Sequence, residues 1–239
     1  MQKNVEKMSI NYSPNFNLRK RSFSKVKYLI FHYTGMKSEK GAIKRLTSNK
    51  SRVSCHYFIK RNGKIIKIVP DLYIAWHAGI SSWKKDKFLN TTSIGIEISN
   101  PGHEHGYNNF SPSQIKSVIS LSKKLKKKYK IKKENILGHS DIAPLRKKDP
   151  GEKFPWKLLN KKKICLWHNL SEKNCKKLRG IKLKNNDNFF KLLFKFGYKS
   201  TNDKNEKIKI YKNFQRRFRP QLISSIVDQE TYEILKSLV

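Results

Sequence analysis

Short apolar runs separated by polar segments predict five β-strands in the first two thirds of the chain. The strongest local signal is the Asn62-Gly63 pair, which lies between two apolar runs and predicts a β-hairpin. A later run places Ile94, Ile96 and Ile98 on one face of a strand and Glu97 on the other. The predicted strands cover residues 28–32, 55–60, 64–69, 93–99 and 135–138.

Helical periodicity is clearest after Ser111. Ser111 is the predicted N-cap, Pro112 takes the first helical position, and Gln114 completes a capping box. Apolar residues then recur at helical spacing as far as Tyr129, with lysines on the opposite face. Shorter helices are predicted over residues 38–48 and from residue 156. Strands interleaved with helices predict an α/β domain with a central mixed β-sheet flanked by helices.

The composition changes near residue 160 and indicates a second region. Residues 164–187 are rich in Lys and Asn, which favours a linker between domains. We therefore expect a catalytic-type domain over residues 1–163, with an extended lead-in over 1–25. Apolar periodicity returns in residues 188–239 in three segments, the last capped by Asp228. These segments predict a small all-α three-helix domain.

Charge is the most unusual feature of the composition. The formal net charge is +37 over 239 residues, which raises the possibility of a nucleic-acid partner. Only ten of the 54 basic residues are Arg, the better residue for contacts with phosphates and bases, and the lysines are spread along the whole chain. We expect a general attraction to anionic polymers and no dedicated nucleic-acid partner.

The sequence also bears on compartment. No apolar run approaches the length of a membrane span, so we expect no transmembrane segment. The first residues show no signal peptide or lipobox, and three cysteines are too few for a disulfide scaffold. These features favour a monomer in the cytoplasm, with the periplasm as the alternative.

Three residues are candidate metal ligands. His32 and His139 each stand at the end of a predicted strand, and Asp149 lies on the proline-containing loop after His139. A surface histidine beside a turn aspartate is the simpler interpretation of the last two, but the third candidate weakens it. Two imidazoles and one carboxylate suit a catalytic Zn²⁺ site, because they leave a fourth position for water.

Amide hydrolysis at such a site needs a base for the water proton and a cation for the oxyanion. Glu97 can supply the base and Lys147 the cation. His56 is expected to be a core or cross-strand residue. Cys165, His168 and Cys175 match no zinc-binding spacing and lack a fourth ligand, so no second metal site is expected.

The sequence resembles the zinc-dependent N-acetylmuramoyl-L-alanine amidases of the type 2 amidase fold, which animal peptidoglycan recognition proteins share. The resemblance covers most of residues 25–160. The segments that carry it are FHYT at 31–34, SCHYFIKRNGKI at 54–65, AWHAGISSW at 75–83, LNTTSIGIEISNPG at 89–102 and GHSDIAPLRKKDPGEKFPW at 138–156.

This resemblance implies one zinc ion held by His32, His139 and Asp149. It also implies that Glu97 and Lys147 are catalytic. His77 and Asn100 fall on segments that line the substrate groove in that family, which implies substrate binding.

The resemblance further implies cleavage of the amide bond between N-acetylmuramic acid and L-alanine in peptidoglycan or muropeptides. A non-catalytic peptidoglycan recognition module is the alternative, but such proteins typically lose a metal ligand, and this chain has all three. The C-terminal region is similar to peptidoglycan-binding domains, although Ser225-Ile226 replace the glycine usually found before the Val-Asp pair.

Overall fold

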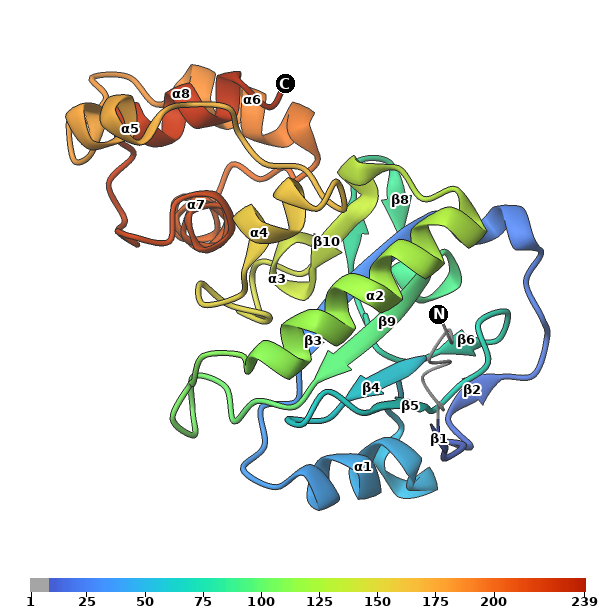
Figure 1. The fold of residues 1–239 in the computed structure, drawn as a ribbon. Coiled ribbons are helices and arrows are strands. Elements are labelled where there is room, and N and C mark those ends of the chain that lie inside the picture. The colour runs from blue at the N-terminus through green and yellow to red at the C-terminus, as the bar shows by residue number, and fades with distance from the viewer. Residues whose placement is uncertain (1–8) are drawn as a thin grey trace. The chain divides into compact units, whose positions relative to one another are not determined.

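The computed structural model describes residues 9–239, which divide into two compact units. The first unit comprises residues 9–77 and 90–131 of the described chain, and the second comprises residues 78–89 and 132–239. The boundaries expected from composition, 1–163, 164–187 and 188–239, stay a prediction. Figure 1 labels most of the helices and strands of both units.

The first unit is built on a mixed β-sheet. Its strands follow the order β1-β5-β4-β9-β3, with β4 and β5 antiparallel and the other neighbours parallel. The sequence prediction of a central mixed sheet flanked by helices is confirmed. The strands are β1 (Ser9–Ile10), β3 (Tyr28–Tyr33), β4 (Tyr57–Ile59), β5 (Ile65–Lys67) and β9 (Ser93–Ile98).

The register between strands decides which side chains share a face. His32 of β3 and Phe58 of β4 are both paired with Glu97 of β9. Paired residues of parallel strands point to the same side of a sheet, so these three share one face. Ile96 pairs with Phe31 and lies on the opposite, apolar face, where both side chains are fully buried. The predicted separation of Glu97 from the isoleucines is confirmed.

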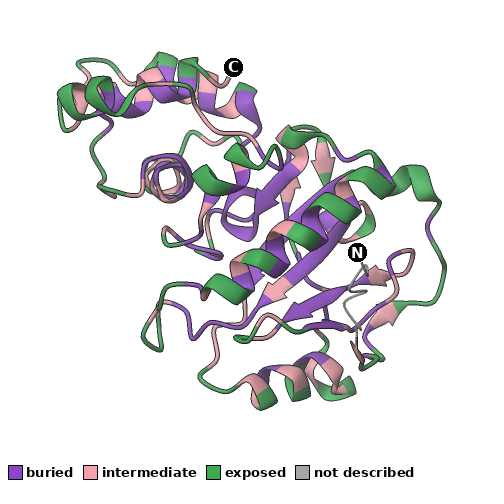
Figure 2. Cartoon of the chain, viewed as in Figure 1, coloured by how far each residue is buried: buried purple, intermediate pink, exposed green. Residues whose placement is uncertain are grey.

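Helices α1 (Glu39–Thr47) and α2 (Pro112–Tyr129) flank the sheet of this unit. Ser111 accepts a hydrogen bond from the backbone of Gln114, and the reciprocal bond is also present, so the predicted capping box is confirmed. Gln114 Nε2 also donates to the carbonyl of Ser99, 2.7 Å away. Figure 2 shows the buried stripe of α2 and its exposed outer face.

Residues 9–25 contain more structure than the extended lead-in predicted for 1–25, whose first eight residues lie outside the described chain. β1 pairs with β5, and β2 (Phe16–Asn17) pairs with β6 (Ile74–Ala75). Two-residue strands leave no periodic pattern, so sequence analysis missed them. Within residues 9–239 the 3-10 helices are η1 (Phe23–Lys25), η2 (Asn49–Ser51), η3 (Leu89–Thr91) and η4 (Lys133–Asn135).

The second unit is mainly helical. α4 starts at Trp156, as predicted, and α6, α7 and α8 overlap the three periodic segments near the C-terminus. The stretch predicted as a linker contains α5 and buries Ile164, Cys165 and Cys175. The helices and strands of the second unit are β7 (Ser82–Trp83), β8 (Asp86–Lys87), β10 (Ile136–Gly138), α3 (His139–Ile142), α4 (Trp156–Lys161), α5 (Glu172–Leu178), α6 (Asp187–Phe196), α7 (Lys204–Phe218) and α8 (Gln229–Lys236).

Trp83 of β7 packs against the turn after α6. Its indole lies edge-on to Phe196 and Tyr198, with ring centroids 5.7 and 5.1 Å away. A Cβ on Gly197 would lie 2.6 Å from this indole, and Gly197 has a φ of +147°, so only glycine fits there. The carbonyl of Gly197 accepts a hydrogen bond from the backbone of Lys84. The segment 78–89 and the C-terminal helices therefore form one packed unit.

None of the helices within residues 9–239 has the length and apolar character that crossing a lipid bilayer requires.

Candidate active site

His32 lies near the end of β3 and is buried. Its Nε2 lies 3.0 Å from His77 Nδ1, and His77 Nε2 lies 3.1 Å from Ser93 Oγ. When His32 donates from Nε2, His77 accepts at Nδ1 and donates onward to the serine hydroxyl. This direction leaves Nδ1 of His32 with a lone pair that can bind a metal ion.

His77 fits over β9 because residue 95 is glycine. A Cβ built on Gly95 would lie 2.4 Å from His77 Cγ, far inside van der Waals contact. The alternation of small and large residues along β9 thus places an imidazole over Gly95, two residues before Glu97. Sequence analysis noted the alternation but assigned no role to the glycine.

His56 is a core residue, as predicted. It is completely buried, accepts a hydrogen bond at Nδ1 from the backbone of Gly95, and lies 3.0 Å from the carbonyl of Tyr73 through Nε2. Burial, reinforced by the guanidinium of Arg21, lowers the pKa of His56 to about 3. The imidazole is therefore neutral under ordinary conditions and serves the packing of the sheet.

Glu97 is half-buried on the face of the sheet that also carries His32. The strand alternation places its carboxylate there, as predicted. Its catalytic role stays a prediction.

His139 and Asp149 meet in the second unit. His139 is the first residue of α3, directly after β10, and its Nδ1 lies 3.1 Å from Asp149 Oδ2. The backbone of Ser140 donates a hydrogen bond to the carbonyl of Asp149, which holds the loop against the helix start. The pair expected from residues ten positions apart is thus in contact.

Two groups lie beside Nε2 of His139. One is the carbonyl oxygen of Ala78 at 3.2 Å, which can only accept, and the other is Nη2 of Arg146 at 3.4 Å, which can only donate. When Nε2 donates to Ala78, the lone pair of Nδ1 faces the carboxylate of Asp149. This tautomer fits a metal ion bound by Nδ1 and Asp149.

His32, His139 and Asp149 form a group that could hold a metal ion. All three are buried, and one ligand atom from each lies within 4.8 Å of the other two. Two nitrogens and one oxygen are the donor set of a catalytic zinc site.

Lys147 lies on the loop between α3 and Asp149 and is half-buried. Its backbone nitrogen donates to the carbonyl of Ala143, and its own carbonyl accepts a hydrogen bond from Asn213 Nδ2. The loop is therefore fixed by its main chain. A role for the ammonium group stays a prediction.

Asn100 is buried, and its side-chain amide organises the following loop. Nδ2 donates to the carbonyl of Asn108, and Oδ1 accepts from the backbone of Gly102. These bonds occupy both ends of the amide, so its predicted contact with substrate stays untested. The same holds for substrate binding by His77, whose ring bonds to His32 and Ser93.

Sequence analysis missed Asp141, which lies in the same GHSD segment as His139. Its Oδ2 accepts from the backbone of Gly138 at 2.7 Å, and Oδ1 accepts from the Tyr198 hydroxyl at 2.6 Å. An aspartate three residues into a helix is a capping signal that the sequence does show. Its partner Arg217 could not be found from the sequence, because the two lie 76 residues apart.

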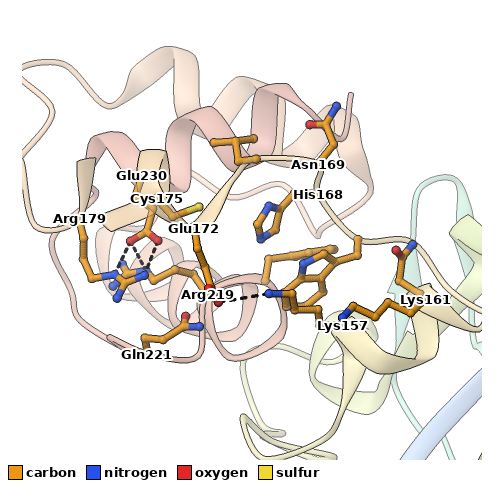
Figure 3. A pocket seen from close by; sticks show the side chains of 14 residues that line it. Lys157, Lys161, His168, Asn169, Glu172, Cys175, Arg179, Arg219, Gln221 and Glu230 are labelled. Atoms are coloured by element: carbon orange, nitrogen blue, oxygen red, sulfur yellow. Dashed lines mark hydrogen bonds and ion pairs between the residues drawn. The ribbon is translucent and has the colours of Figure 1, made fainter. Parts of the chain in front are cut away.

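A separate pocket of about 190 Å³ lies in the second unit, lined by residues from α4, α5, α8 and the end of α7 (Figure 3). Arg179 and Glu230 form a two-point ion pair in its wall, with N–O distances of 2.8 and 2.7 Å. His168 and Cys175 line this pocket, and Cys165 does not. None of the predicted catalytic or metal-binding residues lines it.

Comparisons with known proteins agree with this geometry. Residues 22–152 match the Amidase_2 family, described as N-acetylmuramoyl-L-alanine amidase. The chain is 35% identical over 234 residues to N-acetylmuramoyl-L-alanine amidase AmiD of Escherichia coli, covering 91% of this chain and 84% of that protein. It is 41% identical over 106 residues to 1,6-anhydro-N-acetylmuramyl-L-alanine amidase AmpD of Haemophilus influenzae, covering 44% and 55%.

Solved structures show the same likeness. The complex of E. coli AmiD with anhydro-N-acetylmuramic acid-L-Ala-D-gamma-Glu-L-Lys superposes with a TM-score of 0.82 at 34% identity, covering 93% of this chain and 91% of that one. AmpDh3 of Pseudomonas aeruginosa in complex with anhydromuramic pentapeptide gives a TM-score of 0.80 at 28% identity, covering 100% and 96%.

A mixed sheet that carries a possible His-His-Asp metal site is consistent with a hydrolase of the amidase fold. The chain belongs to the N-acetylmuramoyl-L-alanine amidase family, as the sequence resemblance predicted, and is an amide-bond hydrolase.

Proposed function

We propose that the chain cuts the amide bond between N-acetylmuramic acid and L-alanine in peptidoglycan fragments, with one zinc ion held by His32, His139 and Asp149. The ligands in the AmiD and AmpDh3 structures, both anhydromuramic peptides, support peptidoglycan fragments as the substrate. The observation that carries the metal assignment is the buried group of His32, His139 and Asp149, in which one ligand atom from each residue lies within 4.8 Å of the other two. This group suits a shared cation.

Zinc at this site would supply Lewis acidity toward the scissile carbonyl and the attacking water. In the proposed mechanism, side chains of the protein transfer a proton and stabilise the developing negative charge. Glu97 accepts the proton of the attacking water and delivers it to the leaving amine of L-alanine. The ammonium of Lys147 stabilises the negative charge that develops on the carbonyl oxygen.

His77 and Asn100 complete the proposed site along the substrate groove. His77 has a further part, because its hydrogen bond with His32 orients that imidazole for the metal. Asn100 shapes the loop over residues 100–108 and so sets one border of the groove.

The test combines metal analysis with product analysis. The purified protein should contain about one zinc per chain, as a single three-ligand site implies. His139→Ala should lose most of the zinc, and His105→Ala, which changes an exposed histidine, should keep it. Mass spectrometry of products from anhydromuropeptides and from intact sacculi should show free L-alanyl peptides. Full zinc in His139→Ala, or cleavage at another bond, would overturn the proposal.

For residues 188–239 we propose a small three-helix unit related to peptidoglycan-binding domains. Three helices at the expected positions and the segment resemblance support it. Sedimentation with purified sacculi tests wall binding by this unit, and analytical ultracentrifugation tests whether the protein is a monomer, as proposed.

The cytoplasmic location, with the periplasm as its alternative, stays a prediction that cell fractionation would test.

A further inference from the structure

Asn213 of α7 lies under the loop that joins α3 to Asp149. It is buried, and its Nδ2 donates two hydrogen bonds, to the carbonyl of Pro144 at 2.7 Å and to that of Lys147 at 3.0 Å. One amide group therefore fixes two points of the loop that are three residues apart. The second point is the main chain of Lys147 itself.

Two neighbouring residues of α7, Arg216 and Arg217, also contact Asn213 or the segments next to this loop. Arg216 Nη1 donates to Asn213 Oδ1 at 2.9 Å, which fixes the orientation of the amide, and Arg216 Nε lies 3.6 Å from a carboxylate oxygen of Glu152. Arg217 reaches Asp141 and the carbonyl of Ile136. Positions 213, 216 and 217 fall on one side of a helix, so α7 presents them together.

Without the amide of Asn213, the carbonyls of Pro144 and Lys147 would each lose a hydrogen-bond donor. Pro144 is buried, and a buried carbonyl without a partner is unfavourable, so the loop conformation depends on the amide. The backbone bond from Lys147 to Ala143 closes the turn, and the backbone of Ser140 holds the carbonyl of Asp149. Asn213 fixes the chain between these two points. A shift of this loop would move a metal ligand and the proposed oxyanion group together.

We propose that Asn213 is a positioning residue of the amidase: through the main chain of residues 144–147 it sets the placement of Lys147 and Asp149. This inference rests on the proposed function, which gives those two residues their roles. It also assigns a task to the C-terminal helices beyond any binding of peptidoglycan, because α7 supplies part of the support of the active-site loop.

The experiment compares Asn213→Ala, Asn213→Ser and Asn213→Asp with the unaltered protein. Alanine and serine keep the helix, alanine removes both hydrogen bonds, and serine retains one donor. Aspartate keeps the shape but turns an acceptor toward two carbonyls. Asn188→Ala is the matched control, because Asn188 is an exposed helical asparagine of the same unit that bonds to Tyr232.

The readouts are zinc affinity by chelator competition, and kcat and KM on a soluble anhydromuropeptide, with folding checked by circular dichroism. Support residues of metal sites typically change affinity or activity by about 10–100-fold. We expect a loss of that size in zinc affinity or kcat for Asn213→Ala, more for aspartate, less for serine, and little change in KM. A purely structural role would lower thermal stability and leave kcat and zinc affinity of the folded protein unchanged.

The outcomes separate the two proposals. An unaltered, zinc-loaded protein without amidase activity would overturn the proposed function. An active unaltered protein together with folded Asn213 variants of unchanged kcat and zinc affinity would overturn this inference alone. Should the alanine variant not fold, the serine variant gives the same comparison with one donor kept.

Discussion

Arg217 Nη1 lies 2.5 Å from Asp141 Oδ2, in an ion pair whose two side chains are 2% and 1% exposed. The guanidinium also stacks 4.4 Å from the ring centre of Trp156, and Asp141 caps the turn that begins with His139. The carboxylate receives further hydrogen bonds from Gly138 and Tyr198. A buried pair with this many partners ties α7 to the segment that follows a proposed metal ligand.

Replacing Arg217 with Ala should strongly destabilise the protein. Removing one partner of a buried ion pair leaves the other charge unpaired, which typically costs about 3–5 kcal/mol. The free energy of urea unfolding measures this loss. Lys157→Ala, which breaks an exposed pair with Glu172, is the control and should leave the unfolding midpoint unchanged. An unchanged midpoint in the Arg217 variant would show that the pair contributes nothing.

Gly95→Ala should disturb the imidazole of His77. The new Cβ would meet His77 Cγ at 2.4 Å, so the ring must move and its hydrogen bond with His32 must weaken. Overpacking of this kind costs about 1–3 kcal/mol of stability. Chelator competition should also show weaker zinc binding, since His32 loses its orienting partner.

The control for this variant is Gly41→Ala in α1, where the new Cβ would meet its nearest neighbour at 3.5 Å, an ordinary contact. It should lose neither stability nor zinc affinity, because alanine is a better helix former than glycine. A Gly95 variant with unchanged zinc affinity would show that the His77 contact does not orient His32.

Glu97→Gln should separate catalysis from binding. The substitution keeps the shape of the side chain and removes the base, so kcat should fall by about 10²–10⁴ while zinc content stays the same. Glu104→Gln, at an exposed loop position, should behave like the unaltered protein. Near-normal turnover in the Glu97 variant would mean that another group takes the proton, and His77 would be examined next.

His56 should make the protein sensitive to acid. Its pKa is about 3 in the folded state and 6.5 in an unfolded chain, so the unfolded state binds the extra proton between these values. Stability therefore falls as pH drops below about 6.5, by about 1.4 kcal/mol per pH unit from this group. Between pH 7 and pH 5 Asp71 adds little change, because its carboxyl is ionised both in the folded state, where its pKa is lowered, and in the unfolded chain, where its pKa is the ordinary 3.8.

The measurement is urea unfolding at pH 7 and pH 5 for the unaltered protein and for His56→Gln. The unaltered protein should lose about 2 kcal/mol more than the variant over this interval, since all other groups titrate in both. Equal losses in the two proteins would contradict a neutral, buried His56.

Several features were predictable because local rules decide them. The Asn62-Gly63 pair produces its hairpin, the Ser111 capping box starts α2, and period-two alternation puts Glu97 opposite the isoleucines. Each depends on backbone geometry within a few residues. The metal-ligand candidates also came from local signals, a histidine at the end of each of two strands and an aspartate on a proline-containing loop.

The supporting contacts needed the tertiary structure. Asp141 and Arg217 lie 76 residues apart, and Asn213 lies 66 residues from Lys147, so no sequence spacing connects them. Helix α5 in the predicted linker and the two-residue strands β1 and β2 were hidden for a related reason, because segments this short show no usable periodicity. Periodicity and capping act between neighbours in the chain, and the sequence by itself determined what they control. Burial decides which polar groups must find a partner, and only the folded chain determines which partners are within reach.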